Sequence, residues 1–329
     1  MLDFETAQLI QPSGHAVPDG LASRLSLYFL DRPLEGLREG QARAQRLRVA
    51  VATHATSGEP RGTIVFSPGR TEFIEKYIEA IDDLTQRGFW VVINDPRGQG
   101  LSGRMLEDRL KSYVENFQDY ADDLGWICDT LAPHCPKPWI AMGHSMGGTI
   151  VLQATLSGVL SPSAVICSAP MLGLVDIDSG LMRGGIRGLS ALGLSRRSLP
   201  FQKQRSGLPV AFANNKLTSD KDRYKRWATF FQDTPRLRVG EPTFGWISAA
   251  LVAMGFINRN AAQLGVPGLM VSAWGDQIVD PASVESFAIK AGCNFYVVPG
   301  AKHELFLERD VMRNEFLAVV DAFLEEQAL

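Results

Sequence analysis

The sequence predicts an α/β fold, with a mostly parallel central sheet, helices on both faces of the sheet and a helical insertion late in the chain. Short apolar segments of strand-like composition alternate with helical patterns up to about residue 170, and the alternation resumes near Val266. Strands that alternate with helices indicate a parallel sheet covered on both faces. In addition, glycines surround a serine at a point where a strand leads directly into a helix. A chain of 329 residues is long enough for one large α/β domain with an insertion.

The expected strands are short apolar runs, and helical patterns separate most of them. Residues 74–88 place apolar side chains on one helical face and end at Gly88, and residues 114–131 behave in the same way. Between about residues 171 and 262 there is no convincing strand, only short helical patterns rich in Gly, Leu and Arg. The expected strands lie at residues 46–54, 62–69, 89–95, 139–143, 164–170, 268–276 and 294–300.

These patterns divide the chain into four parts. We expect residues 1–44 to be a polar N-terminal arm on or near the core, and residues 45–170 to be the first part of the core. Residues 171–262 are expected to form a helical cap, and residues 263–329 the second part of the core. Ligands of α/β enzymes bind beyond the carboxyl ends of the strands, where an insertion of this kind would lie as a lid.

Composition and charge argue against several classes of protein. The net charge is −3, the isoelectric point is near 6.0, and Lys and Arg are dispersed, which indicates no nucleic-acid partner. The first residues lack the basic and apolar regions of a secretory signal, and the apolar stretch 244–257 is shorter than the roughly 20 residues that span a membrane. We therefore expect a cytoplasmic protein, and the sequence leaves its oligomeric state open.

The cysteines predict neither a disulfide framework nor a metal site. They show no C-x-x-C spacing and lie beside apolar residues, as reduced thiols in a reducing compartment do. No metal and no other cofactor is expected. The cysteines are Cys128, Cys135, Cys167 and Cys293.

The segment AMGHSMGGTI at residues 141–150 predicts a nucleophilic serine. An apolar strand pattern precedes it and a helical pattern follows, so the chain must turn sharply at Ser145. Small residues on both sides relieve the crowding at such a turn. The pattern G-x-S-x-G between a strand and a helix is the nucleophile elbow, which exposes the serine hydroxyl beside the N-terminus of the helix. The alternative is a glycine-rich turn with an incidental serine.

The partner base is expected to be a histidine, because its ordinary pKa near 6.5 lets it take up and return a proton at neutral pH. His303 follows a late strand and lies in a loop before the final helix, which fits the order serine, acid, histidine. The alternative for His303 is a solvated loop residue. The other histidines are placed less well: His15 in the arm, His54 in an early strand, His134 in a loop and His144 inside the elbow.

Two aspartates in WGDQIVDPAS compete for the role of the acid. Asp280 directly precedes Pro281 and a helical pattern, so it is explained as the N-cap of a helix. Asp276 directly follows the strand, in a turn that begins at Gly275, where its carboxylate can reach His303. We therefore favour Asp276, and Asp280 remains the alternative.

Two backbone N–H groups are expected to form the oxyanion hole. One belongs to Met146, the residue after the nucleophile. The other should come from the loop after the strand at residues 62–69. Pro68 has no N–H and Gly69 permits a sharp turn, which leaves the amide of Arg70 to face the site. The alternative for Arg70 is an ordinary loop residue.

The segments AMGHSMGG, NDPRGQGLSGR, SPGRTEFIEKY, WGDQIVD and GAKHELFLE together resemble the α/β-hydrolases of the monoacylglycerol lipase and bacterial lysophospholipase group. The likeness covers about residues 45–170 and 263–329. It implies that Ser145, Asp276 and His303 form a catalytic triad, with oxyanion amides at Arg70 and Met146. Where monoacylglycerol lipases carry an H-G-x-G-E loop, this chain reads P-G-R-T-E at residues 68–72, which resembles the lysophospholipase branch more closely.

A basic segment of the cap bears on the substrate. Residues 181–205 mix apolar residues with six cations and contain no acidic residue. Such a segment is either a lid helix with solvated arginines or a surface for an anionic membrane or a phosphate headgroup. The cations are Arg183, Arg187, Arg196, Arg197, Lys203 and Arg205.

The apolar residues of this segment favour an acyl chain, so we expect the substrate to be a monoacyl lipid ester. Because fold and triad do not determine the leaving group, a general carboxylesterase, a thioesterase and an aminopeptidase-like amidase remain alternatives. A ligand-binding protein that keeps the fold without the chemistry is a further alternative.

Overall fold

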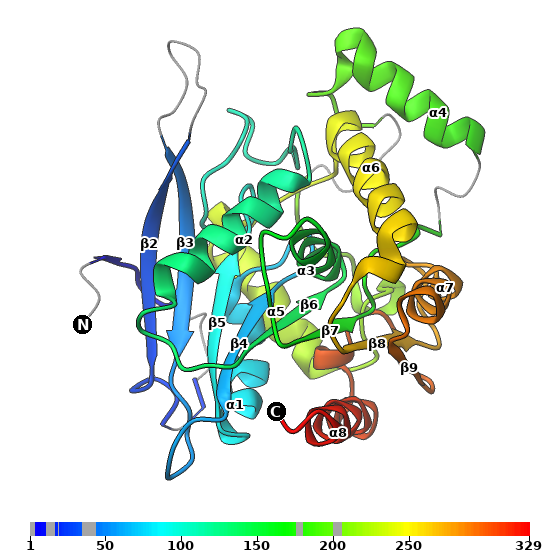
Figure 1. Ribbon diagram of the computed structural model, residues 1–329. Helices are drawn as coiled ribbons and strands as arrows, with labels where there is room; N and C mark the ends of the chain where they lie inside the picture. The colour runs from blue at the N-terminus through cyan, green and yellow to red at the C-terminus, as the bar shows by residue number, and fades with distance from the viewer. Residues whose placement is uncertain (1–3, 11–16, 19, 35–43, 176–179, 200–205) are drawn as a thin grey trace.

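The computed structural model describes residues 4–10, 17–18, 20–34, 44–175, 180–199 and 206–329. One nine-stranded sheet runs through these residues in the order β1-β2-β3-β5-β4-β6-β7-β8-β9 (Figure 1). The six strands β4 to β9 are parallel to one another. At one edge of the sheet, β3, β2 and β1 follow β5, and each pairs antiparallel with its neighbour. Strand bounds are Glu5–Thr6, Leu25–Pro33, Ala44–Ala52, Gly62–Ser67, Phe89–Asp95, Trp139–His144, Ala164–Ser168, Gly268–Ala273 and Asn294–Val298 for β1 to β9.

Alternate residues of the central strands point to opposite faces and so build two separate cores. In β6, Ala141 joins the core under α2 (Gln118–Leu131), α3 (Met146–Leu156), α6 (Phe244–Asn260) and α7 (Pro281–Ala291). Its neighbours Ile140 and Met142 join the core under α1 (Ile78–Gln86) and α8 (Asp310–Glu326). The two sets of helices lie on opposite sides of the sheet in Figure 1. The predicted α/β fold with both faces covered is confirmed.

The element ends differ from the sequence prediction at several places for local reasons. The helix expected at residues 74–88 opens with a 3₁₀ turn, Ile74–Tyr77, before α1. The helix expected from residue 114 begins only at Gln118, whose N–H is bound by the side chain of Asn116. Five expected strands included loop residues at their carboxyl ends; β3, β4, β7, β8 and β9 end at Ala52, Ser67, Ser168, Ala273 and Val298. His54 therefore lies in the loop after β3, not in the strand as predicted.

The segment treated as an N-terminal arm supplies two strands that the sequence analysis missed. β2 pairs with β3 along its whole length, from Leu25 opposite Ala52 to Pro33 opposite Ala44. Its pattern LSLYFLDRP has no clean alternation, because it is buried at positions on both faces. Pairing with β3, which is distant in sequence, decides this strand.

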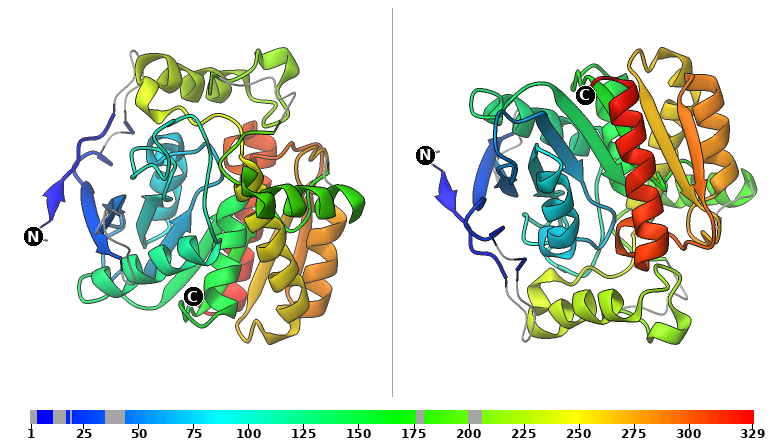
Figure 2. Two further views of the ribbon diagram at one scale, coloured as in Figure 1. Left: turned by 90° about the horizontal axis from the view of Figure 1, so that it is seen from above. Right: turned by 90° about the horizontal axis from the view of Figure 1, so that it is seen from below.

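Helices, and no strand among the described residues, connect β7 to β8. These are α4 (Gly180–Leu189), the π-helical turn η2 (Ser190–Leu194), α5 (Lys221–Asp233) and α6, with short 3₁₀ turns at Phe212–Asn214, Pro235–Leu237 and Ala261–Gln263. In both views of Figure 2, α4 and α5 stand apart from each other at the outside of the molecule. None of the helices in the described ranges is long and apolar enough to cross a membrane.

Candidate active site

The site begins at the sharp turn between β6 and α3. Ser145 takes φ 52° and ψ −118°, a left-handed conformation that is strained for any residue with a side chain. The neighbouring backbone is too close for larger side chains: a Cβ atom on Gly147 would lie 1.8 Å from the carbonyl oxygen of Ser67. A Cβ on Gly143 would lie 2.5 Å from the carbonyl oxygen of Gly147. The glycines of the elbow are therefore fixed by close approach of β4 and α3.

The structure brings Ser145, His303 and Asp276 into one hydrogen-bonded line. The Oγ of Ser145 lies 2.9 Å from Nε2 of His303, and Nδ1 of His303 lies 2.7 Å from Oδ2 of Asp276. His303 is buried and follows β9, and Asp276 follows β8. This geometry lets His303 take the hydroxyl proton of Ser145 while Asp276 orients its ring and stabilises its charged form.

The carboxylate of Asp276 is held in place by the backbone as well. Oδ1 accepts the N–H groups of Ile278 and Val279 at 2.9 and 3.0 Å. Burial tends to raise the pKa of Asp276, but the hydrogen bond and charge of His303, together with these backbone N–H groups, outweigh it and lower the pKa below its ordinary value. Asp276 is therefore ionised at neutral pH.

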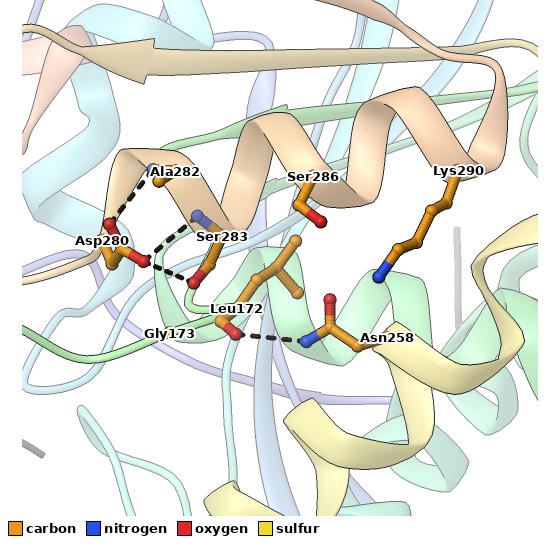
Figure 3. A pocket seen from close by; sticks show the side chains of 8 residues that line it. All are labelled: Leu172, Gly173, Asn258, Asp280, Ala282, Ser283, Ser286 and Lys290. Carbon is orange, nitrogen blue, oxygen red and sulfur yellow. Dashed lines mark hydrogen bonds between the residues drawn. The ribbon is translucent and has the colours of Figure 1, made fainter. Parts of the chain in front are cut away.

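The competing aspartate, Asp280, caps α7. Its two carboxylate oxygens accept the N–H groups of Ala282 and Ser283, at 3.1 and 3.2 Å, and the hydroxyl of Ser283 at 2.6 Å (Figure 3). These bonds satisfy the first turn of the helix, and Pro281 stands at the first helical position.

A shallow hollow of about 370 Å³ lies beside this cap, between α6 and α7. Figure 3 shows the residues that line it. Its polar side chains largely bind their own surroundings: Ser283 donates to Asp280, and Asn258 donates to the carbonyl oxygens of Leu172 and Met254. None of Ser145, Asp276 and His303 lines it. The hollow is therefore separate from the chemistry.

The loop after β4 lies against the elbow, and its amides have separate partners. The N–H of Gly69 donates to the carboxylate of Glu72, and the N–H of Thr71 donates to Oε1 of Gln99 at 2.7 Å. The N–H of Arg70, between them, has no acceptor among the described residues. Met146 is the first residue of α3, so its N–H is one of those that a helix leaves unpaired.

Behind this loop lies a buried cluster of charges that the sequence analysis did not find. Besides binding Gly69, Glu72 accepts the hydroxyl of Tyr77 at 2.6 Å and the Nζ of Lys76 at 2.9 Å. Lys76 also donates to Glu304, beside His303, at 2.6 Å. Glu72, Lys76 and Tyr77 all lie in the segment SPGRTEFIEKY, but nothing in that segment indicates that they are buried together.

Next to the cluster lies His144, whose ring contacts that of His303 with centroids 4.8 Å apart and a tilt of 55° between the ring planes. Burial lowers the pKa of His144 to about 4, although Glu72 opposes the shift. Nδ1 of His144 lies 3.1 Å from the carbonyl oxygen of Ser168, which only accepts, so Nδ1 carries the proton of a neutral ring. A neutral His144 adds no positive charge beside the base.

Several hydrogen bonds join the connection between β7 and β8 to the loop that carries His303. The N–H of Glu304 donates to the carbonyl oxygen of Leu217, and the hydroxyl of Thr218 donates to that of Leu307 at 2.6 Å. The buried carboxylate of Glu308 accepts the N–H of Lys302 at 2.9 Å and the N–H and hydroxyl of Ser219. The loop that carries His303 is therefore held by a segment of the connection between β7 and β8.

Two further observations concern groups of ligating residues. The cysteines lie buried or half-buried with free thiols. In the part of the chain that the structure describes, no three His, Cys, Asp or Glu residues are placed together to hold a metal ion.

The family profile described as serine aminopeptidase, S33 (Hydrolase_4), matches residues 58–310, more than half of the chain. The chain belongs to this family. Among its relatives, lysophospholipase L2 of Escherichia coli is 34% identical over 287 residues, which cover 79% of each chain. The monoacylglycerol lipase of Mycolicibacterium smegmatis is 24% identical over 267 residues, covering 80% of this chain and 88% of that protein.

A solved structure shares the fold of this Hydrolase_4 member. A soluble variant of monoglyceride lipase from Saccharomyces cerevisiae, in complex with a substrate analogue, superposes with a TM-score of 0.72 and 18% identity. The match covers 96% of this chain and 99% of that one. The protein is thus an α/β-hydrolase related to lysophospholipase L2 and to monoacylglycerol lipases, and the resemblance seen in the sequence is confirmed.

Proposed function

We propose that this protein is a serine hydrolase that cleaves the carboxylic ester of monoacyl lipids, with lysophospholipids as its preferred class. The observation that carries the chemistry is the line from Ser145 through His303 to Asp276, with hydrogen bonds of 2.9 and 2.7 Å. The relative that is 34% identical, a lysophospholipase, supports the lipid class.

In the proposed reaction, Ser145 Oγ attacks the ester carbonyl carbon while His303 Nε2 takes the hydroxyl proton. The negative charge that forms on the carbonyl oxygen is stabilised by the backbone N–H groups of Met146 and Arg70. His303 then protonates the leaving alcohol. Water, activated by the same histidine, hydrolyses the acyl-enzyme and restores Ser145.

We also propose that residues 171–262 act as the lid over this site, and that part of the lid touches an anionic membrane surface. Met182, Leu189 and Leu192 are exposed apolar side chains on α4 and η2, Leu192 at 80%. Arg187, Arg196 and Arg197 are exposed near them. Of the other predicted cations, Lys203, Arg205 and the side chain of Arg183 lie outside the described residues.

Amide hydrolysis is the second candidate, because the description of the family is that of an aminopeptidase. A peptidase of this kind is expected to place carboxylates where the substrate amine binds. At the loop after β4 this chain instead presents the side chain of Arg70, which favours an anionic or neutral leaving group.

The test is to incubate the protein with a lysophospholipid, a monoacylglycerol, a short-chain ester and an aminoacyl amide, and to follow each product by mass spectrometry. Ser145→Ala is expected to reduce ester hydrolysis by about a thousandfold or more, because no other group can form the acyl-enzyme. Ester hydrolysis at the wild-type rate in this variant would refute the proposed nucleophile. If the protein cleaved only the amide, the proposed esterase function would be wrong and amide hydrolysis would be its activity.

A further inference from the structure

Among the described residues, the half-buried side chain of Arg70 lacks the adjacent carboxylate that balances the charge of each of the buried arginines. Arg48 pairs with Glu75 and Asp95, Arg97 with Asp123 and Asp119, and Arg313 with Asp83. Arg70 forms no ion pair with any described carboxylate. Its Nη1 donates to the carbonyl oxygen of Gly240 at 2.7 Å, and its guanidinium lies 5.7 Å from the ring centre of Trp246.

These two contacts leave the guanidinium of Arg70 short of partners. A guanidinium has five N–H donors in a planar fork, and the described contacts use one. Burial lowers the pKa of Arg70 to about 10, although the charges of Glu241 and Tyr120 act to raise it. The side chain therefore stays charged at neutral pH, with no counter-charge adjacent to it. A charge held this way costs free energy unless another group neutralises it.

The position of Arg70 indicates which group that is. Its own backbone N–H is a proposed oxyanion donor, so its side chain starts beside the carbonyl that reacts. In a lysophospholipid the ester carbonyl and the phosphate are separated by one glycerol unit, which is similar in length to an extended arginine side chain. A monoacylglycerol has the same ester and the same glycerol but no phosphate.

We infer that the guanidinium of Arg70 binds the phosphodiester of a lysophospholipid whose ester carbonyl occupies the oxyanion hole, and that it thereby selects lysophospholipids over monoacylglycerols. This inference rests on the proposed function and names the residue that binds the lipid headgroup. Arginine suits the task, because its planar fork binds two phosphate oxygens at once. One residue would then contribute its amide to catalysis and its side chain to specificity.

The chain offers a matched control in Arg104. Burial and the nearby Arg109 lower the pKa of Arg104 to about 10 as well. Its Nη1 and Nη2 also bind backbone carbonyl oxygens, those of Ser102 and Arg236. Arg104 lies outside the loop that forms the oxyanion hole.

The experiment compares wild type, Arg70→Met, Arg70→Lys and Arg104→Met on lysophosphatidylglycerol and on a monoacylglycerol with the same acyl chain. The measured quantity is the ratio of the two kcat/KM values, because the backbone amide of residue 70 serves both substrates. Loss of a charged bidentate contact is expected to lower this ratio at least about tenfold in Arg70→Met. Arg70→Lys should recover part of the ratio, and Arg104→Met should keep it.

Equal losses on both lipids in Arg70→Met would overturn the inference and leave Arg70 a structural role. A wild type that cleaves the monoacylglycerol but not the lysophospholipid would also overturn it. A wild type that cleaves neither lipid would contradict the proposed function itself.

A second measurement uses hydrolysis of a short-chain ester. Glycerophosphoglycerol, the product that retains the headgroup, should inhibit wild type and Arg104→Met but inhibit Arg70→Met at least about tenfold more weakly. If inorganic phosphate inhibited wild type as strongly as glycerophosphoglycerol, the site would bind a free anion. The inference that Arg70 binds a lysophospholipid headgroup would then be wrong.

Discussion

At the scale of single residues, Glu72 connects the loop of the proposed oxyanion hole with the surroundings of the proposed base, His303. One of its oxygens accepts the N–H of Gly69 in the loop after β4, and the other lies 3.9 Å from Nε2 of His144, whose ring contacts that of His303. Burial tends to raise the pKa of Glu72, but Lys76 and the other partners lower it to about 2, so it is ionised. We infer that Glu72 is a positioning residue, because it acts through Gly69 and His144.

Glu72→Gln is therefore expected to lower kcat by about ten- to a hundredfold with little change in KM, since a misplaced oxyanion donor weakens binding of the transition state more than of the substrate. Stopped-flow acylation with a chromogenic ester measures the effect. Tyr77→Phe, which removes one hydrogen bond to the same carboxylate, serves as the control and should lose less. A Glu72→Gln protein with wild-type kcat and only a lower melting temperature would show a merely structural role.

The residues that sequence reasoning reached and those it missed differ in a physical way. Ser145, Asp276 and His303 each follow a strand, and parallel strands bring their carboxyl ends to one edge, so order along the chain was enough to group them. Glu72 and His144 became interpretable only when burial was known. If Glu72 were exposed, it would be an ordinary carboxylate of a surface loop.

At the scale of elements, the same division applies. The central strands were predictable because burial on both faces makes each a continuous apolar run, as the fully buried β4 and β7 illustrate. The edge strand β2 and the ends of the helices were not, because pairing with β3 and local hydrogen bonds such as that of Asn116 decide them.

A further prediction concerns binding of α4 and the adjoining η2 to membranes. Because Leu192 and Met182 are exposed beside Arg187, Arg196 and Arg197, we expect the protein to sediment with vesicles containing anionic phosphatidylglycerol, and less with neutral phosphatidylcholine vesicles. Burial of apolar side chains in the bilayer interface supplies the affinity, and the arginines supply the preference.

Replacing both apolar residues, in Met182→Asp/Leu192→Asp, should reduce the bound fraction several-fold. Ile289→Asp is the matched control, because Ile289 is an apolar side chain of α7 that is 75% exposed. Equal loss of binding in the two proteins would show that α4 has no special part in it, and α4 would then be a lid helix with solvated arginines.

At the scale of the whole molecule, the buried cluster around Lys76 couples folding to pH. Glu72 and Glu304 both bind Lys76, and one lysine cannot neutralise two carboxylates. Burial raises the pKa of Glu304 to about 7, against the attraction of Lys76 and with the repulsion of Glu72. One oxygen of Glu304, Oε2, is buried and has no hydrogen-bond partner among the described residues, which agrees with a carboxyl group poorly suited to carry charge.

The sign of the effect follows from the protons bound. Between the unfolded pKa of 4.5 and the folded pKa of about 7, Glu304 holds a proton in the folded state that it has lost in the unfolded state. This contribution to the free energy of unfolding therefore falls as pH rises through that range. The lowered pKa values of Glu72 and Asp276 act in the opposite sense, and their contributions are lost only as pH falls below about 4.

We accordingly expect Glu304→Gln to gain stability relative to wild type as the pH is raised from 5 to 8, because the amide stays neutral where the carboxyl must ionise. Urea unfolding at both pH values gives the difference between the two proteins. Glu315→Gln provides the control, because Glu315 is half-buried outside the cluster and accepts the hydroxyl of Tyr296. A difference that is the same at pH 5 and pH 8 would mean that Glu304 does not titrate in this range, and that Lys76 neutralises it more fully than Glu72.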